Sequence, residues 1–189
     1  MRKKIYGIIW EEQLQRGVAA EISQALMEEV YTTPKPGLVD REDTGAHTDM
    51  NCQTFQKSTE AIAEDLAAMF EAGYSWEADP KTLFPLLRER GKKTEEKMFV
   101  ATGGVNTHKG IIFTIGILAA AAGISLRNYG KIESEDVCRI SLEMTKKELE
   151  QDLRKLKQSS GITHGEKIYC HLGEKGCLLY TSPSPRDRG

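Results

Sequence analysis

The sequence predicts an all-α protein, and two observations carry that prediction. Apolar residues recur at intervals of three and four along most of the chain, which is the spacing of one face of a helix. Strand signals are nearly absent, because only residues 167–172 alternate weakly and no Asn-Gly or Asp-Gly turn joins two β-rich runs. With 189 residues, the chain suits a single helical domain.

The apolar spacing and the turn residues together place the helices. The expected helical segments are residues 11–31, 55–73, 80–91, a short stretch before Gly103, 107–122 and 135–158. Pro34 and Pro36 end the first segment, whereas Gly91 and Gly123 are interpreted as C-terminal ends of later ones. The segment 107–122 is apolar on every side, so we expect it at the centre of the fold with other helices around it.

Composition narrows the class of protein. A net charge of −2 with mixed signs gives no basic face for nucleic acid. The basic N-terminus is followed by too few apolar residues for an export signal, and the longest apolar run falls short of a membrane span of roughly 20 residues. Four cysteines without a C-x-x-C pair argue against structural zinc. We therefore expect a cytoplasmic protein without nucleic-acid or membrane partners; its oligomeric state is left open.

A glycine-rich motif, residues 102–110 (Thr-Gly-Gly-Val-Asn-Thr-His-Lys-Gly), precedes the apolar helix. Two glycines allow a turn with bare N–H groups, Asn106 or Thr107 can cap the helix, and Lys109 adds a positive charge, which together suit a phosphate chain. The motif is not a Walker A loop, because His108 precedes the lysine and Gly110 follows it. The alternative is a helix-ending turn followed by an ordinary cap.

A second polar cluster covers residues 33–41 and 45–50. Lys35 lies between two prolines, so its backbone is stiff. Asp40, His47 and Asp49 are candidates for metal binding or proton transfer, and the alternate positions of His47 and Asp49 make their side chains point the same way. The alternative is an exposed, solvated loop. Residues 163–165 (Thr-His-Gly) are a weaker candidate for the same roles, metal binding or proton transfer.

The last residues break the helical pattern. Residues 177–189 contain Ser-Pro-Ser-Pro and an Arg-Asp-Arg cluster, and they look like a translated adapter or vector sequence. We therefore expect a domain over residues 1–176 and a tail over 177–189 that lies outside the fold, and we expect the native protein to continue past Gly176.

The two polar clusters, Phe55 with Ser58, and residues 162–165 closely resemble, in order and spacing, the triphosphoribosyl-dephospho-coenzyme A synthase family. The resemblance implies that ATP and 3′-dephospho-coenzyme A are joined with release of adenine. The product is the prosthetic-group precursor for the acyl carrier protein of citrate lyase or malonate decarboxylase. Such a glycosyl transfer needs neutralised phosphates, a base for the attacking hydroxyl and an acid for the departing adenine.

This resemblance leads to an assignment of roles. Lys35, Lys109 and the Gly103–Gly104 amides are expected to bind the triphosphate, and Asp40 and Asp49 a Mg²⁺ ion. His47 or His108 is the expected base, with Asp49 also in the catalytic group. The helix N-terminus should lower the pKa of His108 and keep its ring neutral. The further substrate-binding candidates are Gly37, Arg41, Ser58, Thr102, Asn106, Thr107, Thr163 and His164.

Two other functions stay open at this point. One is a helical metal-dependent phosphohydrolase that uses His47, Asp49 and His164 and leaves the base attached to its nucleotide. The other is a non-catalytic nucleotide-binding or scaffold protein.

Overall fold

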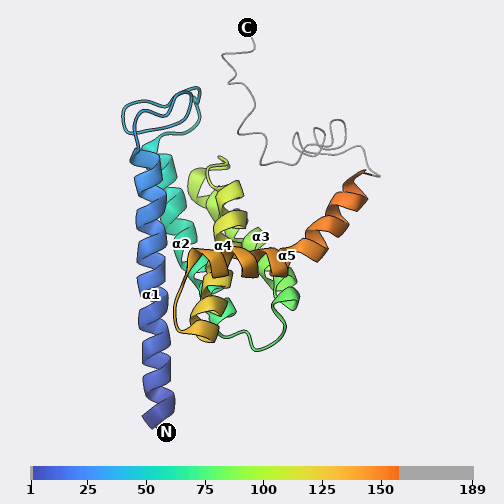
Figure 1. The fold of residues 1–189 in the computed structure, drawn as a ribbon. Helices are drawn as coiled ribbons and strands as arrows, with labels where there is room; N and C mark the ends of the chain where they lie inside the picture. Colours follow the sequence, from blue (N-terminus) through green and yellow to red (C-terminus); the bar gives the residue numbers. More distant parts are fainter. Residues whose placement is uncertain (1, 158–189) are drawn as a thin grey trace. The chain divides into compact units, whose positions relative to one another are not determined.

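The computed structural model describes residues 2–157. Their helices are α1 (Arg2–Tyr31), α2 (Cys52–Tyr74), the short 3-10 helix η1 (Pro80–Thr82), α3 (Phe84–Thr102), α4 (Lys109–Tyr129) and α5 (Ser134–Lys157) (Figure 1). No strand occurs within residues 2–157, so the all-α prediction is confirmed. Thr163, His164 and the tail lie outside the described residues.

The chain divides into two compact units. The first covers residues 1–144 and holds α1 to α4 together with the beginning of α5. The second covers residues 145–189, and its described part is the continuation of α5 to Lys157. The core and the candidate-site residues that the structure describes lie in the first unit. The predicted boundary at residue 176 remains a prediction.

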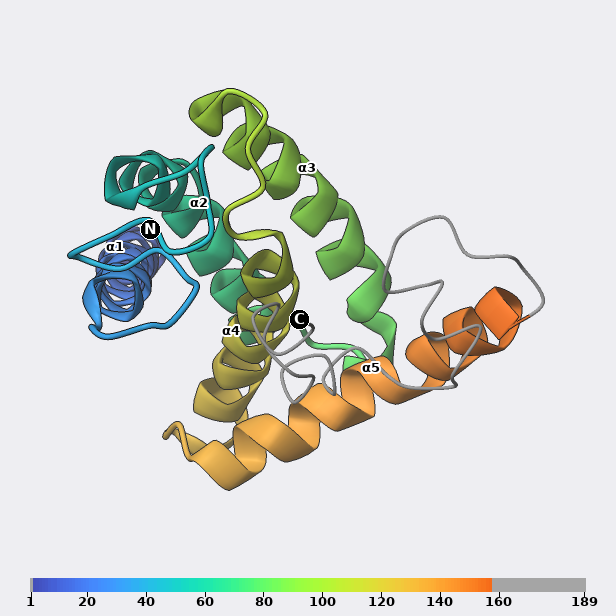
Figure 2. The same ribbon diagram turned by 90° about the horizontal axis from the view of Figure 1, so that it is seen from above.

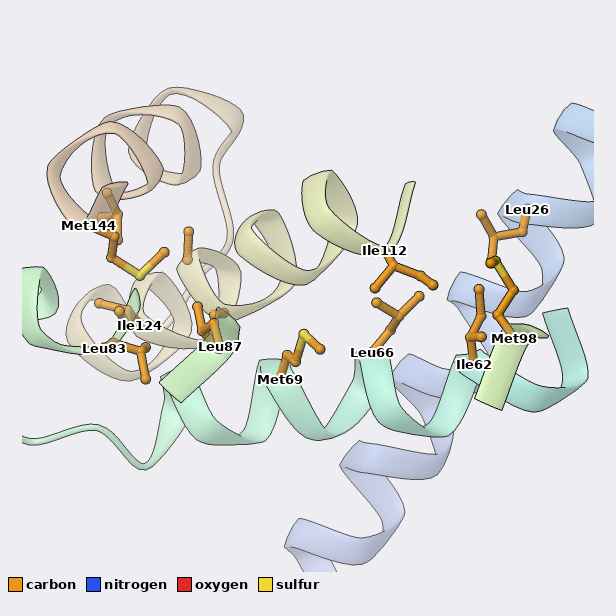
Figure 3. Close-up of a cluster of buried hydrophobic side chains, with 13 residues drawn as sticks. Leu26, Ile62, Leu66, Met69, Leu83, Leu87, Met98, Ile112, Ile124 and Met144 are labelled. Atoms are coloured by element: carbon orange, nitrogen blue, oxygen red, sulfur yellow. The ribbon is translucent and has the colours of Figure 1, made fainter. Parts of the chain in front are cut away.

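The core of the first unit follows α2, which packs against α1, α3 and α4. Figure 3 shows the buried side chains as a row along this helix, from Leu26, Ile62 and Met98 at one end to Leu83, Ile124 and Met144 at the other. The prediction that α4 is surrounded on all sides is only partly correct. Ile112 on α4 is buried, but Phe113 is 49% exposed. The central helix is therefore α2.

Glycines bring α2 and α4 into backbone contact. A Cβ at Gly73 would lie 2.8 Å from the Cα of Ala120, and one at Gly123 would lie 2.6 Å from the backbone nitrogen of Tyr74. Such distances are shorter than real Cβ contacts, so only glycine allows the helices to approach this closely. Gly123 therefore lies inside α4, and its predicted role as the end of that helix is wrong; α4 ends before Gly130.

Other predicted boundaries also change. Gly91 lies inside α3, so the expected helix 80–91 and the short helix before Gly103 are largely one element. The first helix begins nine residues earlier than expected, at Arg2. Among the described residues, α4 is the one helix long and apolar enough to cross a membrane by length and composition. Its packing in the core of the first unit, against α2 and α3, accounts for the same apolar character.

Candidate functional site

The two polar clusters lie at the same end of the helices. Residues 32–51 form the loop between α1 and α2, and residues 103–108 connect α3 to α4 (Figures 1 and 2). Helix α2 begins directly after the first loop, with Asn51 as its N-cap. The first two turns of α2 therefore bring Phe55 and Ser58 to the second loop.

Three polar residues at this end contact one another, and two of them, Ser58 and His108, are buried. The Thr107 hydroxyl donates to the Ser58 hydroxyl oxygen at 2.7 Å, and Ser58 Oγ lies 2.6 Å from His108 Nδ1. The Phe55 ring meets the imidazole edge-on, with centroids 5.1 Å apart. The backbone N–H of His108 donates to Met98 Sδ at 3.2 Å. Two residues of α2 thus hold the imidazole, Met98 of α3 holds the His108 backbone, and the residue is 1% exposed.

Burial keeps this imidazole neutral. It lowers the pKa of His108 to about 4, and the negative charge of Glu29 acts weakly in the opposite direction. The predicted direction is confirmed, but its main cause is burial rather than the end of a helix. Nε2 is buried and has no hydrogen-bond partner among the described residues. Whether the ring proton lies on Nδ1 or on Nε2, Nε2 is the ring atom still able to donate or accept a bond.

Asp40 anchors the first loop. Its carboxylate accepts backbone N–H groups from Lys35 at 3.0 Å, Glu42 at 2.8 Å and Asp43 at 3.0 Å. The N–H groups of Asp43, Glu42 and Lys35 lower the pKa of this carboxyl. The side chain is buried, and the three bonds occupy most of its roughly four acceptor positions. Asp40 therefore fits a role in shaping the loop, and its role as a Mg²⁺ ligand stays a prediction.

Lys35 connects this loop to α1. Its ammonium donates to the backbone oxygen of Glu29 at 2.8 Å and to the Glu29 carboxylate at 3.1 Å. The same carboxylate acts on the buried His108. Sequence reasoning missed Glu29, because a charged residue near the end of a helix carries no pattern that separates it from a solvated one.

The remaining candidates of the first loop lie nearer the surface. His47 Nδ1 is 3.8 Å from Asp49 Oδ1, in agreement with the prediction that the two side chains point the same way. Arg41 places its guanidinium 5.3 Å from the centre of the Tyr31 ring. Gly37 has a φ of 80°, which suits the turn that closes the loop. Within the described residues, no group of three or more His, Cys, Asp or Glu side chains could hold a metal ion.

The glycine-rich motif is used differently from the prediction. The N–H of Gly103 bonds to the Val100 carbonyl at 3.5 Å, and that of Gly104 to the Phe99 carbonyl at 2.7 Å. Both glycines have positive φ angles, so this is a helix C-cap and the expected bare N–H groups are not bare. The substrate-binding role of these glycines remains a prediction.

Neighbouring polar residues hold the motif in shape. The Thr102 hydroxyl donates to the Val105 carbonyl at 2.6 Å. The N-cap of α4 is His108 and no side chain makes a capping bond to it, so the predicted cap by Asn106 or Thr107 is wrong. The Asn106 side-chain oxygen instead accepts the backbone N–H of Lys109, the first residue of α4, at 3.3 Å. Lys109 itself reaches across to α3 and pairs with Glu95 at 2.6 Å. The sequence did not indicate Glu95, because a charged residue inside a helix with many charged residues carries no pattern that separates it from a solvated one.

Comparisons with known proteins agree with this arrangement of motifs. A family model described as ATP:dephospho-CoA triphosphoribosyl transferase matches residues 15–177. Relatives named "Probable 2-(5''-triphosphoribosyl)-3'-dephosphocoenzyme-A synthase" occur in Streptococcus pyogenes serotypes M3, M1 and M2, with 39%, 39% and 38% identity over 178 residues. Each alignment covers 86% of this chain and 60% of the relative, so the chain spans about 60% of the length of these relatives. No solved structure shows a significant match.

Proposed function

The chain belongs to the ATP:dephospho-CoA triphosphoribosyl transferase family, and from that premise we propose that it transfers the triphosphoribosyl group of ATP to 3′-dephospho-CoA. The bond between the ribose C1′ of ATP and adenine breaks, and a ribose hydroxyl of dephospho-CoA forms the new bond to that carbon. The hydroxyl loses its proton to a base, and adenine takes up a proton as it departs. The triphosphate stays intact. The product serves the acyl carrier protein of citrate lyase or malonate decarboxylase, and the reaction takes place in the cytoplasm.

The observation that carries this proposal is the buried pair formed by Ser58 of α2 and His108 of the glycine-rich motif. A transfer through an oxocarbenium-like state needs a group that moves or shares a proton at the reacting centre. The neutral His108 ring has one nitrogen held by Ser58 and the other unpartnered. We assign Nε2 to that role. His47, next to Asp49 in the other loop, is the second candidate.

Magnesium belongs to the same proposal. Mg²⁺ usually binds one or two carboxylates together with substrate phosphates and keeps several waters. A site of this kind needs no cluster of three protein ligands, and Asp49, whose side chain is 61% exposed, is a carboxylate of this loop with room for a Mg²⁺–ATP complex. When bound, the ion would neutralise charge on the triphosphate. Asp40 would support it by fixing the loop.

Chromatography of ATP and dephospho-CoA after incubation with the protein and Mg²⁺ tests the proposal. Free adenine should appear as dephospho-CoA is consumed. Release of phosphate with the base still attached would support a phosphohydrolase instead, and no turnover would support a non-catalytic nucleotide-binding protein. Either of these results contradicts the proposal.

Two variants test the assignment of roles. His108→Ala should mainly lower turnover, by about 100- to 10,000-fold if the ring transfers a proton. Lys109→Ala should mainly raise the ATP concentration needed for half-maximal rate. Lys131→Ala, which removes an exposed lysine between α4 and α5, is the matched control. Unchanged kinetics in both test variants would remove the glycine-rich motif from the site.

A further inference from the structure

A small cavity lies between α3 and α4, above Met69 of α2. Its volume is about 120 Å³. Pockets that hold a whole drug-sized ligand measure roughly 300 to 1,000 Å³, so this cavity has room for one ring system rather than a complete nucleotide. Its walls are mainly apolar, with Phe84 and Leu87 from α3 and Ile112 and Phe113 from α4.

Gly91 keeps this cavity open. It lies in the interior of α3, where glycine costs roughly 0.5 to 1 kcal/mol relative to alanine. No close packing explains the glycine, because the nearest heavy atom to a Cβ built there is Ile112 Cγ2 at 3.9 Å. This contrasts with Gly73 and Gly123, where a Cβ would meet backbone. The absent side chain of Gly91 leaves empty volume on the cavity side of α3.

The entrance of the cavity is both aromatic and positively charged. Phe113 is 49% exposed and meets Phe84 edge-on, with centroids 6.1 Å apart, so one flat apolar ring is open to a ligand. The charged residues among the lining are three cations and one carboxylate: Arg88, Lys92, Lys109 and Glu95. The Lys109–Glu95 pair holds the lysine along α3. Lys92 pairs with Glu89 on an exposed surface, where such a pair is weak and can yield to an anion.

The cavity also adjoins the motif that carries the candidate site. His108 and Lys109 are consecutive residues, yet His108 contacts Ser58 on α2 and Lys109 contacts Glu95 on α3. A larger apolar cleft of about 780 Å³, bounded by α1, α2, α4 and the start of α5, has Glu21 as its charged lining residue and no cation. A ligand with phosphates therefore fits the smaller cavity better.

We propose that the cavity between α3 and α4 binds the base of an adenosine polyphosphate and that Arg88, Lys92 and Lys109 bind its phosphates. This inference rests on the proposed function for the identity of the ligand. ATP and dephospho-CoA both carry an adenosine with 5′-phosphates, so either substrate has the required chemistry. Aromatic stacking contributes about 1 to 3 kcal/mol per base, which corresponds to roughly 5- to 150-fold in affinity.

Binding measurements on two variants test this assignment. Gly91→Leu fills the cavity from α3, and Phe113→Ala removes the exposed ring without leaving a buried void. Each should weaken binding of ATP, of dephospho-CoA, or of both at least fivefold in titration calorimetry. Inorganic tripolyphosphate, which has no base, should keep its affinity. Gly17→Ala, which adds a methyl group beside the larger cleft where no heavy atom lies within 4 Å, is the matched control.

The outcomes separate the two substrates and the two proposals. Loss of ATP affinity alone assigns the cavity to the donor, and loss of dephospho-CoA affinity alone assigns it to the acceptor. Unchanged affinities in both variants, or no nucleotide binding by the wild-type protein, would overturn the cavity assignment. If adenine is released while affinities are unchanged, the transfer stands without the cavity. If the variants lose affinity but the wild-type protein releases no adenine, the cavity stands without the transfer.

Discussion

Acid should destabilise the first unit through His108. The pKa of this imidazole falls from 6.5 to about 4 in the folded protein because the ring is buried. The unfolded chain therefore binds the proton more readily than the folded one at pH values between these two. One pKa unit corresponds to about 1.4 kcal/mol, so the complete effect is on the order of 3 kcal/mol. This stability is fully present above pH 6.5 and is lost as the pH falls toward 4.

Urea unfolding followed by circular dichroism measures this loss. Between about pH 7.5 and pH 4.5, wild-type protein should lose about 2.5 kcal/mol more than His108→Gln, which has no titrating group at this position. Glutamine also changes stability at neutral pH, so the comparison uses only the pH dependence of each protein. The pKa of Asp40 is lowered from 3.8, so its contribution is lost mainly below this window. Equal pH dependence in the two proteins would refute the argument.

Three further changes test separate parts of the structure. Gly73→Ala should lower stability by roughly 1 to 3 kcal/mol, because α2 and α4 must move apart, whereas Gly17→Ala should be neutral or stabilising; equal melting temperatures would contradict the close crossing. Asp40→Asn should speed hydrogen exchange of the three amides that bond to this carboxylate, and unchanged protection would show that the loop does not depend on it. Glu29→Gln should lower the pKa of His108 still further, as measured by NMR titration, because the charge that raises it is gone; a rise would contradict the assigned electrostatics.

The helical class and the two loops could be predicted because they depend on local signals. Apolar spacing located the helices, and prolines and glycines located the loops. Local signals could not tell a glycine that ends a helix from one that lies inside a helix for reasons of packing. Gly91 and Gly123 look like helix ends in sequence, but one borders a cavity and the other contacts the backbone of α2. Those roles depend on residues far away in the chain.

The candidate site was also predictable only as far as local sequence signals reach. The motifs indicated Ser58 and His108, but not that a hydrogen bond would join residues 50 positions apart. The glycines at 103 and 104 could serve as a helix cap or as a phosphate-binding turn, because both uses need positive φ angles. The bonds of their N–H groups to carbonyls of α3 show that the glycines form the cap, and their part in substrate binding stays a prediction.

Because α2 and α4 cross in backbone contact, a small change in the angle between them moves their distant ends by a larger amount. Gly73 lies 15 residues after Ser58 on α2, and Gly123 lies 15 residues after His108, the N-cap residue of α4, so each of these two segments is about 22 Å long at 1.5 Å per residue. Both segments run from the crossing to the same end of the helices (Figure 1). A change of only about 5° in their angle would move the far ends by about 2 Å, enough to break the 2.6 Å contact between Ser58 and His108. We therefore expect a substitution at Gly73 or Gly123 to disturb the contact between Ser58 and His108 through the angle between α2 and α4.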